Sequence, residues 1–284
     1  MNKTPSCHNS PLLGGSLSAL GALALIAAAL ATSPVSLRAE VKAKNPAGKI
    51  YVASVAGGSQ ITVGDKVEDL APKSAYPAQG ALIETRPHGT LAMVFSNGTG
   101  VFLDQDTHIE VKRFTQEPFI PSRTDLAAEP SVSQTEVFLS HGIIAVSTSK
   151  LAPGSTMIYR TALGSINLHG GKLVLESDDD LTKISVLEGN GTVYGGEFDL
   201  IGKVIRAGEQ AIIRQGPPGQ PNFVEIGKIP TGELVSLEEK VIMANDARKT
   251  VFFQTDETGE IVVVQVVPAS LPVNVTISPS QLPH

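Results

Sequence analysis

Glycine-containing turns alternate with short apolar runs along residues 49–216, and this alternation narrows the possible folds more than any other feature. The runs at 50–55, 91–95 and 143–146 are rich in β-branched or apolar residues. Turns spaced about 8–12 residues apart are typical of β-sandwiches and rolls, and not of strands that alternate with helices. Asn97-Gly98 is the strongest hairpin signal, because both turn positions need positive φ. Further turn glycines are Gly57-Gly58, Gly89, Gly142, Gly154, Gly164, Gly170-Gly171, Gly189, Gly191, Gly195-Gly196 and Gly208. The sequence therefore predicts an all-β domain, a β-sandwich or β-roll of short strands, over residues 40–216.

Two polar segments interrupt this β pattern. The stretch around 119–133 contains proline with serine and acidic residues, which predicts an exposed loop. Loops on a rigid scaffold commonly carry binding residues, so we expect 115–135 to offer a contact surface. Asp178-Asp179-Asp180 is expected to form the tip of a hairpin that joins 173–175 to 184–187.

A different organisation is expected after residue 216. Gln215–Pro221 reads QGPPGQP and predicts a linker, since its prolines and glycines cannot continue a sheet. One short helix follows, with Thr231 as its cap and apolar residues at helical spacing. A strand pair, 251–253 with 261–267, would then turn at 257–259. We expect linker, helix and strand pair to occupy 217–267, and the proline-rich tail 268–284 to be extended.

The first 39 residues predict export. Residues 17–31 are all apolar or small, as in the core of a signal peptide, with cleavage after Ala31 or Ala39. The alternative is an uncleaved membrane anchor over residues 12–37. We expect the chain to contact a membrane only through such an anchor. Cys7 precedes the apolar run, so a cleaved chain would have no cysteine. The expected location is periplasmic or extracellular.

Composition excludes several classes of protein. With 42% hydrophobic and 18% charged residues the chain is not globally disordered. Its net charge of −6 and its lack of a lysine or arginine cluster argue against nucleic acid as a partner.

The residues that commonly carry chemistry do not form a recognisable motif. His88, His141 and His169 each precede a glycine, so a turn explains them, and no spacing typical of a metal site occurs. The aspartates at 104–106 and 178–180 do not match a calcium loop. The sequence contains no nucleophile elbow. It also has no tryptophan, so few aromatic side chains could stack against a sugar in a cleft. We therefore predict no catalytic residue, no metal ligand and no cofactor.

His141 and Arg160 are the two polar residues that are candidates for binding. Both stand at strand ends or in loops, and we expect them to brace the core and not to form a site.

The order of motifs between Gly64 and Gly208 resembles the FecR-domain family. Residues 80–85 are similar to its early strand ending in threonine, and 87–90 with 94–99 to its central turn–strand–turn. Residues 186–189 and 206–211 resemble its closing strands. Asn167–Gly171 departs from the family's Arg-Gly-Thr, so a role for that arginine does not carry over.

The resemblance implies an envelope β domain without known catalytic residues. The apolar run starts close to Met1, so we expect no cytoplasmic sigma-factor-binding segment before it. The leading functional hypothesis is a non-enzymatic exported protein that binds a partner protein or a surface glycan, with signalling as one option. An open sheet edge could accept a partner strand. A structural or surface-layer component is the alternative, and a hydrolase with a carboxylate pair is the third.

Overall fold

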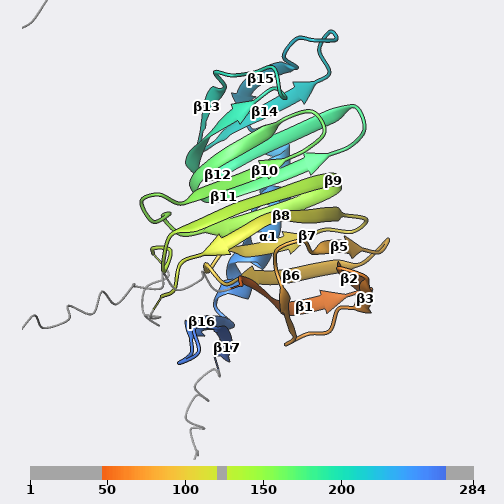
Figure 1. Ribbon diagram of the computed structural model, residues 1–284. Coiled ribbons are helices and arrows are strands. Elements are labelled where there is room, and N and C mark those ends of the chain that lie inside the picture. Colours follow the sequence, from red (N-terminus) through yellow and green to blue (C-terminus); the bar gives the residue numbers. More distant parts are fainter. Residues whose placement is uncertain (1–46, 120–126, 267–284) are drawn as a thin grey trace, which may run out of the picture. The chain divides into compact units, whose positions relative to one another are not determined.

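The computed structural model describes residues 47–119 and 127–266 (Figure 1). The expected signal or anchor segment, the tail 268–284 and the middle of the 115–135 loop lie outside the described residues. The chain divides into two compact units, Met1–Lys42 and Ala43–His284, and all described residues belong to the second. No helix in the described ranges is long and apolar enough to cross a membrane.

The described chain consists mainly of strands, with one helix near its end. Fifteen strands form one sheet: β1 Lys49–Ala56, β2 Ser59–Val63, β3 Lys66–Asp69, β4 Ala75–Pro77, β5 Leu82–Thr85, β6 Thr90–Phe95, β7 Gly100–Leu103, β8 His108–Gln116, β9 Ser133–Thr148, β10 Thr156–Arg160, β11 Ser165–Ser177, β12 Leu181–Tyr194, β13 Lys203–Arg206, β14 Glu209–Arg214 and β15 Phe223–Lys228. The helix α1 Thr231–Arg248 and the hairpin of β16 Val251–Thr255 with β17 Ile261–Gln265 follow.

The single sheet is folded into two layers. Layer A runs β3–β2–β5–β8–β9–β10–β11–β12–β13, and layer B runs β4–β1–β6–β7–β9–β11–β12–β14–β15. Three long strands belong to both layers. The first half of β9 pairs with β8 and β10, and its second half pairs with β7 and β11.

Glycines let these long strands bend from one layer into the other. Gly142 of β9, Gly170 and Gly171 of β11, and Gly189 of β12 have φ values of 96°, 117°, 110° and 81°. Such positive φ values suit glycine and strain other residues. The sequence predicts turns at these positions, with short strands between them. The strands instead continue through the bends, because both halves keep their pairing partners.

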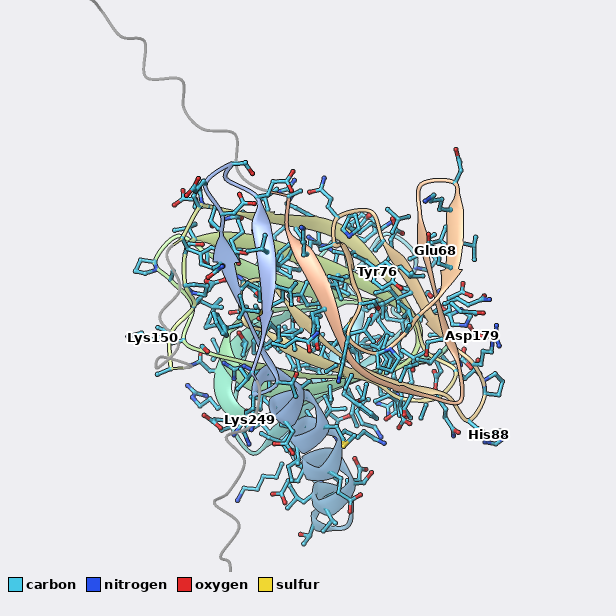
Figure 2. The ribbon with its side chains drawn as sticks, turned by 90° about the horizontal axis from the view of Figure 1, so that it is seen from below. Glu68, Tyr76, His88, Lys150, Asp179 and Lys249 are labelled. Atoms are coloured by element: carbon cyan, nitrogen blue, oxygen red, sulfur yellow. The ribbon has the colours of Figure 1, made fainter. Side chains whose placement is uncertain are left out.

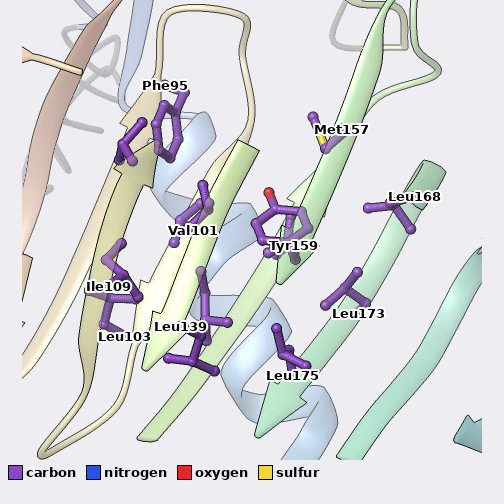
Figure 3. Packing of buried hydrophobic residues seen from close by; sticks show 14 of the residues in the cluster. Phe95, Val101, Leu103, Ile109, Leu139, Met157, Tyr159, Leu168, Leu173 and Leu175 are labelled. Atoms are coloured by element: carbon purple, nitrogen blue, oxygen red, sulfur yellow. The ribbon is translucent and has the colours of Figure 1, made fainter. Parts of the chain in front are cut away.

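The main core lies between the two layers. Figure 3 shows Met157, Tyr159 and Leu168 of layer A in the same interior as Val101, Leu173 and Leu175 of layer B. Phe95 of layer B meets Phe114 of layer A with ring centroids 5.1 Å apart. Burying each such side chain contributes about 1.5–3 kcal/mol to folding, so this interface dominates stability.

Helix α1 covers the outer face of layer B and forms a third layer (Figure 1). Leu237, Val241 and Ala244 pack on alternate residues of the β strands, such as Val94 and Phe102. The strands β6 and β7 are therefore buried on both faces, which explains their continuous apolar sequences.

Several polar contacts link the helix to the sheet, among them those of Lys240 and Arg248. Lys240 forms an ion pair with Asp104. The buried Arg248 donates from Nε to the carbonyl of Gly98 at 2.7 Å. Burial lowers the pKa of this arginine, and the negative charge of Glu188 opposes that shift. The helix begins as expected, but Thr231 is its first residue and not its cap, since Pro230 holds the cap position and no side chain caps the helix.

The all-β class, the helix and the C-terminal strand pair are confirmed.

The structure does not contain the expected linker. Residues 215–222 join β14 to β15, which pair antiparallel from Arg214↔Phe223 to Glu209↔Lys228. Proline and glycine here form a hairpin turn, so the sheet continues past residue 216 by one strand.

Candidate binding surface

Large apolar side chains are exposed to solvent on the loop that joins β12 to β13. The loop Gly195–Gly202, which we call the 195–202 loop, exposes Phe198 by 58% and both Leu200 and Ile201 by 89%. Val204 of β13 and Phe223 of β15 are also exposed. We call the three loop residues Phe198, Leu200 and Ile201 the apolar cluster. Exposed apolar patches of this kind mark interaction sites in soluble proteins.

Asp199 gives the 195–202 loop a defined conformation. Its Oδ2 accepts from the backbone N–H of Gly195 at 2.9 Å, and its Oδ1 accepts from Gly202 at 2.9 Å and from Ile201 at 3.2 Å. These N–H groups, first that of Gly195, together with the charge of Lys203, lower the pKa of Asp199, while partial burial opposes them. The loop is therefore pre-ordered with its apolar side chains outside, which reduces the entropy lost on binding.

The same loop covers the start of β15. The N–H of Asn222 donates to the carbonyl of Gly195 at 2.8 Å, and Lys203 Nζ donates to the carbonyl of Val224 at 2.6 Å. A Cβ at Gly195 would lie 2.5 Å from the Asn222 carbonyl oxygen, so only glycine allows this approach. Backbone groups at this end of β15 thus have partners, which disfavours addition of a partner strand there.

A small hollow lies beside the loop, on the outer face of layer A. Pairing places Arg160 of β10, Ser165 of β11 and Tyr194 of β12 directly opposite one another. Ser165 is small and buried between the two larger side chains. We call this hollow the notch; it is lined by Ile158, Arg160, Ser165, Asn167, Tyr194, Gly196, Glu197 and Asp199.

Neither Arg160 nor His141 braces the core. The Arg160 side chain is 47% exposed and donates from Nε to Glu136 at 2.6 Å. The His141 side chain is 49% exposed, and its Nε2 lies 3.7 Å from Asp106. Both residues point outward from layer A, so the expectation that they stabilise the interior is wrong.

Two histidines do come near acidic residues. His88 and His141 line an open hollow with Asp104, Asp106 and Asp178, and Figure 2 shows His88 and Asp179 toward the same side of the molecule. Asp104 is already paired with Lys240. No group of three or more His, Cys, Asp or Glu residues in the described ranges could hold a metal ion. His169 lies elsewhere and bonds Asn190 at 2.8 Å.

The buried side chain of Glu129 holds the described part of the 115–135 loop in place through hydrogen bonds. Glu129 accepts from Asn97 Nδ2 at 3.1 Å, from Ser155 Oγ at 2.6 Å and from the N–H of Ala152 at 3.1 Å. Ser133 Oγ also donates to it. The described part of this loop is therefore bound to the chain's own turns.

Sequence reasoning missed the apolar cluster, although a signal was present. It treated Gly195-Gly196 as one more hairpin turn. The turn continues through Phe198, Leu200 and Ile201, and three large apolar residues within a glycine-bounded loop cannot all enter a core.

The family model described as FecR protein matches residues 81–190, which extend from β5 through most of β12 and include strands of both layers. No curated protein matches the sequence. Two crystal structures of an anti-sigma factor candidate from Parabacteroides distasonis are similar to the chain, with TM-scores of 0.40 and 0.38 and identities of 13% and 14%. Each comparison covers 66% of this chain and 99% of that one. Residues 81–190 are therefore similar to the FecR family model, as the motif order predicted.

Proposed function

We propose that this chain is an exported, non-enzymatic binding protein of the bacterial envelope, which recognises a partner protein through the apolar cluster. The observation that carries the proposal is the exposure of Leu200 and Ile201, each 89% accessible on a loop that Asp199 holds in place. Leaving such side chains in water is unfavourable, and burial against a partner would remove that cost.

The surroundings of the cluster favour a protein partner. The loop that carries the cluster borders a hollow lined by charged residues, including Asp199, Lys203 and Arg214, as in the polar rim of a protein interface. The FecR domain supports a role in signalling. The apolar N-terminal segment supports export.

The test uses the full chain as bait in an envelope extract, with three forms compared. The wild type is expected to recover one stoichiometric partner. The double variant Leu200→Ser/Ile201→Ser should weaken this binding by about 30-fold or more, the equivalent of about 2 kcal/mol for a hot spot. Val67→Ser is the matched control, since Val67 is 62% exposed but lies on β3, far along the sheet.

Circular dichroism should show that all three forms are folded, because the substituted side chains are outside the core. Equal recovery of the partner by the double variant would disprove the role of the cluster. Self-association of the purified wild type that the double variant abolishes would instead favour the structural or surface-layer alternative.

A further inference from the structure

We infer that the notch between Arg160 and Tyr194 is a binding site for a neutral saccharide, separate from the contact with a partner protein. Neighbouring strands lie about 4.8 Å apart, so the backbones of Arg160 and Tyr194 are about 10 Å apart, with the short Ser165 side chain between them. We place a single pyranose ring in the hollow above Ser165, between the two larger side chains.

The lining of the notch combines an aromatic ring with polar groups that have no partner. The side chains of Ser165, Asn167 and Glu197 make no hydrogen bond within the described ranges, and Arg160 uses only its Nε there. An amide, a hydroxyl, a carboxylate and two guanidinium N–H₂ groups are thus available as donors and acceptors. A pyranose presents alternating hydroxyl groups, which this mixture of donors and acceptors can satisfy.

Tyr194 supplies the apolar part of such a site. Its ring packs closely against the adjoining loop, because a Cβ at Gly202 would lie only 2.8 Å from the ring atom Cε1. Ile158 on the opposite side adds a second apolar surface. The C–H face of a sugar can lie against a fixed aromatic ring at little cost in side-chain entropy.

The charges at the notch favour a neutral ligand. Glu136 neutralises Arg160 at 2.6 Å, while Glu197 carries an unpaired negative charge at the rim, within the described ranges. An acidic saccharide would meet this carboxylate without a cation at the notch to offset it, since the guanidinium already faces Glu136.

The experiment titrates the full chain with neutral tetrasaccharides (cellotetraose, maltotetraose and chitotetraose) and with an acidic oligogalacturonate. Isothermal titration calorimetry is the readout, because it does not depend on the tyrosines that the variants remove. At least one neutral tetrasaccharide should bind at millimolar concentration. Tyr194→Ala should weaken that binding by about tenfold or more, and Tyr194→Phe should keep it within about threefold.

Three further variants test whether saccharide binding depends on the notch itself. Tyr76→Ala changes the other partly exposed tyrosine, on β4 at the far end of layer B, and should have no effect. Asn167→Ala should weaken binding about threefold or more, through loss of hydrogen bonds. Leu200→Ser/Ile201→Ser should leave saccharide binding intact, so failure of the protein-partner proposal and failure of this one can be told apart. Absence of neutral binding, binding only to the acidic oligomer, or unchanged binding by Tyr194→Ala would each overturn the saccharide site.

Discussion

At the scale of single residues, Asp199 determines whether the apolar cluster is presented in one conformation. Its ionised carboxylate is favoured by the N–H groups of Gly195, Gly202 and Ile201, which lowers its pKa. The stabilisation is therefore present above the unfolded-state pKa of aspartate and is lost as the pH falls through the lower folded-state value. In an NMR titration the amide protons of Gly195 and Gly202 should shift with a midpoint below the ordinary aspartate pKa. A midpoint at or above that ordinary value would contradict this arrangement.

At the scale of elements, the docking of α1 depends on a glycine in the strand beneath it. A Cβ at Gly100 of β7 would lie 2.0 Å from the carbonyl oxygen of Ala244, so the helix would have to move away. Gly100→Ala should lower the free energy of unfolding by about 1–3 kcal/mol, the usual cost of overpacking, measured by urea denaturation. Gly232→Ala in the first turn of α1 is the control, because nothing lies within 4 Å of its Cβ. That change should stabilise the protein by up to about 1 kcal/mol. Equal effects of the two substitutions would show that α1 is not closely packed.

At the scale of the whole molecule, we expect the bent strands to make the two layers one cooperative unit. Gly171 of β11 lies at a bend with φ 110°, and a Cβ there would be 2.1 Å from the Glu188 carbonyl oxygen. Gly171→Ala should therefore reduce hydrogen-exchange protection equally in β10 of layer A and β14 of layer B. Gly208→Ala is matched in backbone strain, with φ 81°, but has nothing within 4 Å, and should have only a local effect. Loss of protection in one layer alone would mean that the layers unfold separately.

The local pattern was enough to predict much of this fold. Alternation of apolar runs with glycines indicated an all-β structure, because side-chain period and turn chemistry are properties of neighbouring residues. The helix 231–248 and the strand pair after it followed from the same kind of signal. The resemblance to the FecR domain rested on the order of such motifs, and the family match over 81–190 agrees with it.

Tertiary structure alone decided which glycines turn the chain and which only bend it. Gly142 and Gly171 are residues typical of turns. Their strands nevertheless continue, because pairing partners exist on both sides of each bend. Gly216 and its neighbouring prolines, expected to form a linker, close a hairpin for the same reason. The sequence likewise did not show that Leu200 is exposed, or that Arg160 and Tyr194 lie on either side of Ser165. Both features depend on residues that long-range strand pairing brings together. Local sequence determined the type of structure, and the contacts between distant strands determined its surface.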